Sequence, residues 1–81
     1  MTKKEKKLIA DLNKDMPTEE IRQDIIDTQR EIATMTREEK GFRLLGDRLS
    51  MMRAGSRSEG IKERRQFVKN LKAILEVRGE L

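Results

Sequence analysis

Hydrophobic residues recur three and four positions apart through most of the chain. Residues with this spacing share one face of an α-helix, because each residue turns the helix by about 100°. No stretch of useful length alternates apolar and polar residues as a strand does. The pattern predicts an all-α fold, either a small helical bundle or an extended helical hairpin of three to four helices, with a dimer as one option.

Two helices are predicted in the first half of the chain. The first is short and rich in lysine, and covers about residues 3–14. Pro17 ends that segment, and we expect Thr18 to cap a second helix, because a threonine hydroxyl accepts a bond from an exposed backbone N–H. The predicted apolar stripe of the second helix consists of Ile21, Ile25, Thr28 and Ile32.

A third helix is predicted to begin near Arg37. Thr36 and Glu39 have the spacing of a capping box, in which each side chain bonds the other residue's backbone N–H. The main apolar face of this helix is expected to contain Phe42, Leu45, Leu49 and Met52. Leu44 and Met51 point about 120–140° away from that face, so we expect the helix to contact two partners.

A break is predicted at residues 55–58, where glycine and serine cluster, and a last helix is expected from there to about Arg78. Its expected apolar face contains Phe67, Val68, Leu71, Ile74 and Leu75. Met51, Gly55 and Ile61 also occupy three positions that a helix-turn-helix requires, which keeps that motif as an alternative. Ser56 and Arg64 do not fit its usual pattern.

The chain divides into two parts at Pro17. Residues 1–17 are expected to form a basic arm or short helix, and residues 18–81 a single helical domain. A domain of this size buries only roughly 60–65% of the surface that its unfolded chain exposes. We therefore expect a homo-oligomer, because a second chain would bury more of that surface.

The formal net charge of +4 conceals three blocks of alternating sign. Residues 1–14 carry a net charge of +3, residues 15–39 carry −5, and residues 53–72 carry +5. On helices these charges form two ordered rows. We call the first the acidic ridge, made of Glu20, Asp24, Asp27 and Glu31. We call the second the basic ridge, made of Lys62, Arg65, Lys69 and Lys72.

The side chains that usually perform catalysis are scarce in this chain. It contains 0 His, 0 Cys, 0 Trp and 0 Tyr, so acid–base chemistry would depend on carboxylates or lysines alone. We expect a non-enzymatic protein without cofactor or metal. The lack of cysteine fits a reducing compartment, and no apolar run is long enough for a signal peptide. A cytoplasmic protein with no membrane partner is therefore expected.

The charge pattern leaves two kinds of binding function open. The first is a nucleic-acid-associated accessory or regulatory protein, because a row of cations contacts phosphates regardless of base sequence. Its expected contact residues are Arg53, Arg57, Lys62, Arg65, Lys69 and Lys72. The second is an adaptor or inhibitor of a host protein, of the phage or mobile-element type, with the basic ridge paired to its own acidic ridge. Its expected interface residues are Leu44, Arg48, Met51, Glu20, Asp24, Asp27 and Glu31.

The run from Ile61 to Leu75 resembles the second helix of the small two-helix ribosomal protein at the rim of the large-subunit exit tunnel. The resemblance covers under a quarter of the chain. Because basic amphipathic helices share this composition, we carry over no function from it.

Overall fold

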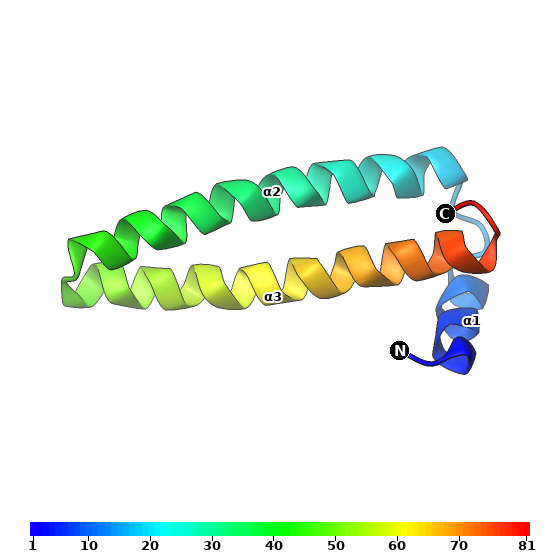
Figure 1. Cartoon of the computed structure of the whole chain (residues 1–81), viewed down its shortest axis with the longest axis horizontal. Coiled ribbons are helices and arrows are strands. Elements are labelled where there is room, and N and C mark those ends of the chain that lie inside the picture. The colour runs from blue at the N-terminus through cyan, green and yellow to red at the C-terminus, as the bar shows by residue number, and fades with distance from the viewer.

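The computed structural model describes all 81 residues and contains three α-helices and no strand. They are α1 (Lys3–Leu12), α2 (Thr18–Leu45) and α3 (Arg48–Val77). Helices α2 and α3 run antiparallel as a long hairpin, and α1 lies across α3 at the end that holds both chain termini (Figure 1). The molecule measures 47 × 23 × 17 Å. The all-α prediction is confirmed.

The hairpin turns at Gly46 and Asp47. Gly46 has a φ of 71°, a left-handed conformation that costs glycine little, and its N–H bonds the Phe42 carbonyl oxygen at 3.4 Å. The Asp47 carboxylate then caps α3 by accepting a bond from the Ser50 N–H at 3.1 Å. The turn therefore comes nine residues before the predicted break at Gly55, as the sequence numbering shows. That predicted break is wrong.

The continuous path of α3 also removes the helix-turn-helix alternative. Gly55 and Gly60 both lie inside α3, so the segment from Met51 to Arg64 contains no turn. Each glycine inside a helix lowers the stability by roughly 1 kcal/mol relative to alanine, a loss that packing elsewhere can offset. Ala54, next to the first of these glycines, is completely buried.

The two predicted threonine caps are also wrong. Thr36 lies inside α2, where its hydroxyl donates to the Ile32 carbonyl oxygen at 2.7 Å. This local bond to the preceding turn satisfies the hydroxyl without ending the helix. Pro17 holds the N-cap position of α2 and makes no side-chain cap bond, and Thr18 is the first helical residue. The predicted third helix is consequently divided between α2 and α3.

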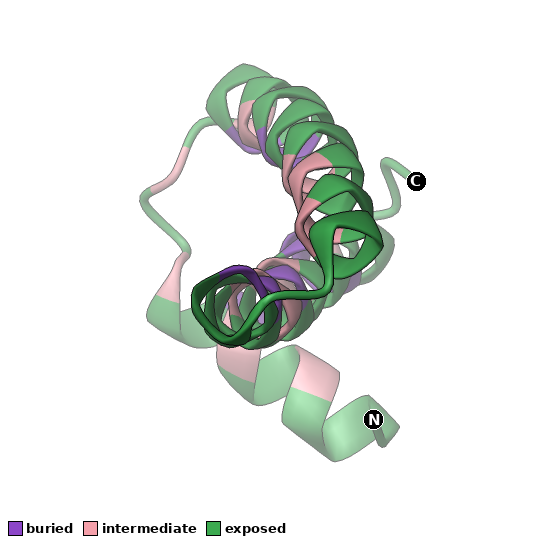
Figure 2. Cartoon of the chain, turned by 90° about the vertical axis from the view of Figure 1, so that its left-hand side faces the viewer, coloured by how far each residue is buried: buried purple, intermediate pink, exposed green.

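The buried aliphatic core lies at the α1 end of the hairpin. Figure 2 shows buried residues on the facing sides of α2 and α3. The core cluster consists of Ala10, Ile21, Ile25, Val68, Leu71, Ile74 and Leu75. The predicted apolar stripe of the second helix is confirmed at Ile21, Ile25 and Thr28, which are all buried. Phe67, expected on the apolar face of the last helix, is instead exposed.

Helix α1 is fixed to the hairpin by the apolar residues Ile9 and Ala10 and by several polar contacts. Ala10 enters the core cluster, and the Lys6 ammonium pairs with the Glu76 carboxylate of α3 at 2.8 Å. The guanidinium of Arg78 donates to the Asn13 carbonyl oxygen at 3.2 Å and to the Thr18 hydroxyl at 3.1 Å. These bonds connect the end of α3 to the C-cap of α1 and to the first residue of α2.

Candidate nucleic-acid interface and exposed hairpin tip

Two ion pairs join α2 to α3 along one flank of the hairpin. The Arg64 Nε lies 2.6 Å from a Glu31 carboxylate oxygen, and the Arg57 Nη2 lies 3.1 Å from a Glu38 carboxylate oxygen. The two glutamates are seven residues apart, as are the two arginines, which is about two helical turns. Both pairs therefore lie on the same side, which we call the ion-paired flank.

The basic ridge lies on the other flank. Its four residues are turned about 80–160° from Arg64 around the axis of α3. The acidic ridge faces the ion-paired flank, since its member Glu31 pairs with Arg64. The sequence left open that the two ridges pair within one chain. The structure does not contain this pairing.

The cations of the basic ridge are exposed and almost entirely without carboxylate partners. The Lys62 ammonium is 3.9 Å from a carboxylate oxygen of Glu59, but both side chains are about three-quarters exposed, at 75% and 73%. Such exposed ion pairs contribute little to the stability of the fold. Arg65, Lys69 and Lys72 form no ion pair within 4.0 Å. Over ten residues of helix the ridge extends about 15 Å.

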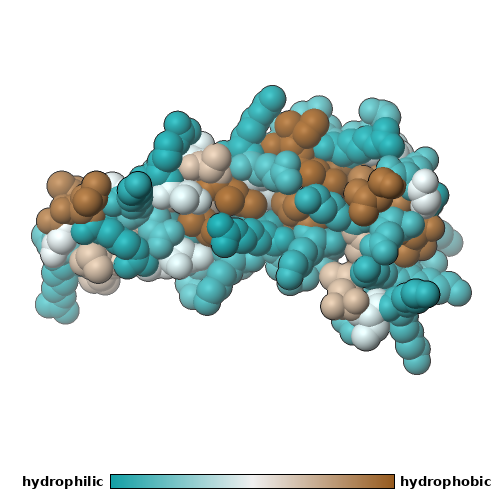
Figure 3. Space-filling view, in the orientation of Figure 1, coloured by the Kyte–Doolittle hydropathy of each residue, from teal (hydrophilic) through white to brown (hydrophobic).

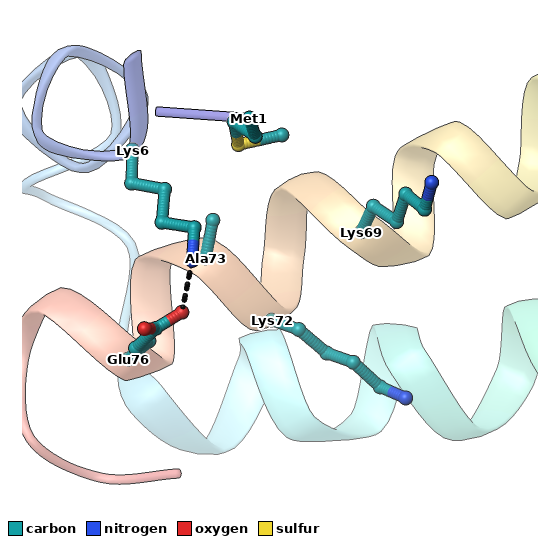
Figure 4. Close-up of a pocket in the computed structure, with 6 residues that line it drawn as sticks. All are labelled: Met1, Lys6, Lys69, Lys72, Ala73 and Glu76. Carbon is teal, nitrogen blue, oxygen red and sulfur yellow. Dashed lines mark hydrogen bonds and ion pairs between the residues drawn. The ribbon is translucent and has the colours of Figure 1, made fainter. Parts of the chain in front are cut away.

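Helix α1 brings a further lysine to the end of this ridge. A shallow pocket of about 270 Å³ separates α1 from α3, and Figure 4 shows the side chains around it. Lys6 reaches across to Glu76, whereas Lys69 and Lys72 extend from α3 without a carboxylate partner. The pocket lining consists of Met1, Lys6, Lys69, Lys72, Ala73 and Glu76.

The other two predicted nucleic-acid contacts, Arg53 and Arg57, lie apart from the ridge. Both guanidinium groups stand over the Phe42 ring, 5.9 Å and 5.8 Å from its centroid, and Arg57 is also paired with Glu38. Arg53 is turned about 100–180° from the ridge residues around α3. The structure thus divides the six predicted contact residues into a ridge of four and a pair near the turn.

The hairpin tip, which we define as residues 40–53, exposes several large apolar side chains. Figure 3 shows a hydrophobic cluster at this end of the molecule. The predicted interface residues Leu44, Arg48 and Met51 come together here, all exposed. Three more apolar residues join them, although the sequence placed them on a core face. These are Leu45, Leu49 and Met52, with exposed fractions of 70%, 56% and 65%.

The acidic ridge does not reach the tip. Glu20, Asp24 and Asp27 lie in the half of α2 near α1 and form no ion pair, although Asp27 accepts a bond from the Gln23 amide at 2.9 Å. No group of three carboxylates converges as a metal site would require. The predicted protein-interface residues therefore form two separate surfaces.

Asp47 is the ionisable group with a perturbed pKa. Hydrogen bonds from the Ser50 side chain and from the Ser50 backbone N–H lower the pKa of this carboxyl. The ionised carboxylate therefore caps the N-terminus of α3, where a negative charge is favourable.

None of the three helices is both long and apolar enough to cross a membrane. Comparison with protein-family models, with curated proteins and with solved structures found no match to this chain.

Proposed function

We propose that this protein is a non-enzymatic helical module that binds the phosphate backbone of a nucleic acid through its basic ridge. The observation that carries the proposal is the lack of intramolecular partners. Of the four ridge cations, only Lys62 has a carboxylate within ion-pair distance, and both side chains of that pair are about three-quarters exposed to water, at 75% and 73%. The ridge charges are therefore available to an external polyanion.

The arrangement favours contacts to the backbone over contacts to bases. Phe67 is turned about 140–160° from the ridge residues, and Phe42 is covered by two arginines. No aromatic ring is therefore placed to stack on bases beside the ridge. Contacts from lysine and arginine to phosphates are insensitive to base sequence, so the expected binding is non-specific.

Pairing between copies of the chain is a weaker explanation of the two ridges. The ridges lie on opposite flanks, so the basic ridge of one copy would meet the acidic ridge of the next and leave a second pair of ridges free. Such a contact is heterologous and does not close as a two-fold dimer. A homodimer held by the ridges is thus disfavoured, and an external polyanion remains the better partner.

The proposal is tested by fluorescence anisotropy with a labelled DNA duplex and with a labelled RNA of the same length. Four phosphate contacts predict that affinity for the duplex falls about 150-fold between about 50 and 200 mM salt. The double variant Arg65→Glu with Lys69→Glu should abolish binding, because it places two carboxylates in the middle of the ridge.

The matched control is Arg30→Glu with Arg37→Glu. These arginines are exposed on α2 and form no ion pair. Each double reversal changes the formal net charge from +4 by −4, to zero. Binding that is absent at low salt contradicts the proposal, as does an equal loss in both doubles, which would reflect net charge alone.

The adaptor alternative is supported only by the hairpin tip, where Leu44, Arg48 and Met51 lie together. An adaptor of this kind would lose its host partner on Leu44→Asp with Met51→Asp and would keep its affinity for nucleic acid. Leu8→Asp, at an exposed position on α1, is the control for a general effect of added charge.

A further inference from the structure

The hairpin tip carries more exposed apolar surface than folding explains. Leu44 is 80% exposed, and the four neighbouring apolar side chains are all at least 42% exposed. They are Leu45, Leu49, Met51 and Met52. Large apolar side chains that gather at one end of a surface indicate an interaction site, whereas single exposed apolar residues are ordinary.

The apolar side chains of the tip point in several directions. Leu44 and Leu45 are turned about 100° from each other on α2, and Leu49 and Met51 about 160° from each other on α3. A flat protein surface would cover only one side of such a tip. Burial of all five side chains requires a medium that surrounds the end of the hairpin.

Cations lie around and behind these apolar residues. Lys40 and Arg53 lie four residues from Leu44 and Leu49, which is about 6 Å along each helix, and Arg48 begins α3. None of these three cations has an ion-pair partner. The carboxylates nearby are engaged, since Glu39 pairs with Arg43 at 3.0 Å and Asp47 caps α3. The tip therefore combines exposed apolar side chains with unpaired positive charge, from Arg48 at the turn and from Lys40 and Arg53 behind it.

We propose that the hairpin tip inserts into the surface of an anionic lipid bilayer. Peripheral helices place apolar side chains about 5–10 Å into the headgroup and acyl boundary, while lysine and arginine stay at the level of the phosphates. Lys40 and Arg53, about 6 Å behind Leu44 and Leu49, match this geometry, and the long side chain of Arg48 can extend back from the turn to the phosphates. Asp47, exposed in the turn, keeps the insertion shallow because a carboxylate is costly to move into hydrocarbon.

A second copy of the chain is a less suitable occupant. Contact between two tips would bring together the unpaired cations of both copies, and like charges at an interface oppose association. The proposal departs from the expectation of no membrane partner. That expectation rested on the lack of a long apolar run, which excludes a spanning helix but leaves surface insertion open.

Insertion is tested with a single fluorescent reporter, because the chain contains no Trp. Met52→Trp places the reporter at the tip, and Leu12→Trp places it on α1, at a residue that is 76% exposed. Vesicles of equal parts phosphatidylcholine and phosphatidylglycerol should shift the emission of the tip reporter to the blue, and brominated acyl chains should quench it. Pure phosphatidylcholine vesicles should do neither, and the α1 reporter should stay unshifted.

A second experiment measures partition of the full chain onto the same vesicles. Leu44→Ser with Leu49→Ser should weaken binding at least about tenfold, because two aliphatic side chains no longer leave water. Leu8→Ser with Leu12→Ser is the control, since both leucines are exposed on α1. Equal effects of the two doubles would overturn the proposal, as would an unshifted tip reporter.

The basic ridge can also attract anionic vesicles, so its contribution is separated by Arg65→Glu with Lys69→Glu. That variant should bind more weakly and still shift the tip reporter fully once bound. A blue shift that depends on protein concentration in the absence of vesicles would overturn the proposal in favour of self-association. Because the tip and the ridge are separate surfaces, failure here leaves nucleic-acid binding by the ridge unaffected.

Discussion

The terminal methyl group of Met35 on α2 lies against the backbone of Gly60 on α3, in the space that a Cβ atom at Gly60 would occupy. The same stretch of hairpin holds the Glu31–Arg64 and Glu38–Arg57 ion pairs on either side of this contact. The glycine thus allows the methionine side chain to cover α3 where the helices approach.

Gly55→Ala and Gly60→Ala should therefore change the free energy of unfolding by different amounts, although both glycines lie inside α3. A Cβ at Gly55 meets nothing within 4 Å, so we expect the free energy of unfolding to rise by about 0.5–1 kcal/mol. Gly60→Ala should gain at least about 0.5 kcal/mol less, because Met35 must move. In a Met35→Ala background the difference should disappear. Urea denaturation followed by circular dichroism measures each glycine variant with Met35 and with Ala at that position. Equal gains in stability from Gly55→Ala and Gly60→Ala when Met35 is present would contradict the contact.

Ile21→Ala and Ile26→Ala compare one substitution on two faces of α2. Ile21 is completely buried in the core cluster, whereas Ile26 is 43% exposed. We expect Ile21→Ala to lower the free energy of unfolding by about 2–4 kcal/mol and Ile26→Ala by less than about 1 kcal/mol. Urea midpoints distinguish the two, and similar losses would mean that α2 presents a different face to α3.

Gly46→Ala should destabilise the hairpin, because a side chain strains the left-handed conformation that ends α2. The expected loss in the free energy of unfolding is about 1–2 kcal/mol, with a smaller loss for Gly46→Asn. Gly41→Ala is the control, since Gly41 is helical and a Cβ there has open space. Thermal unfolding should show opposite signs for the two alanine variants, and a gain at Gly46 would contradict the position of the turn.

We expect Asp47 to make a pH-dependent contribution to the free energy of unfolding. Its pKa is lower in the folded chain than in the unfolded one, so folding favours the ionised form. The contribution is present above the unfolded pKa and disappears as the pH falls through the folded pKa. Asp47→Asn keeps a capping side chain at every pH. The stability advantage of the native chain over this variant should shrink between about pH 6 and pH 2 in urea titrations; a constant difference would contradict the assignment.

The sequence predicted the helical class and the contact face near α1 because these depend on local periodicity. Ile21 and Ile25 lie four residues apart on α2, as Leu71 and Leu75 do on α3, and all four side chains are buried as that spacing predicts. The position of the turn depended on competition between several weak signals. The glycine and serines from Gly55 onward are typical of a break, but α3 continues through them. The chain turns instead at Gly46, which has a left-handed conformation, and at Asp47, which caps α3.

The candidate site was predictable in composition and only partly in arrangement. The spacing of the basic ridge placed its four cations on one helix face, as the single helix α3 requires. Its position opposite the ion-paired flank depends on how α2 and α3 face each other, which no local pattern specifies. The tip was predicted only in part for the same reason: Leu44, Arg48 and Met51 were expected at an interface, whereas Leu45 and Leu49 resemble core residues until the chain turns between them.

The confinement of the core cluster to the α1 end gives the hairpin an uneven resistance to local unfolding. Its seven members lie in α1, the first turns of α2 and the last part of α3, so separation of the helices near Gly46 disrupts none of them. Local opening costs least where few apolar side chains are buried. Amide protons of α2 and α3 should therefore exchange with solvent fastest near the turn and progressively more slowly toward Ile21 and Ile74, so that the exposed apolar residues of the tip lie on the part of the hairpin that opens most easily.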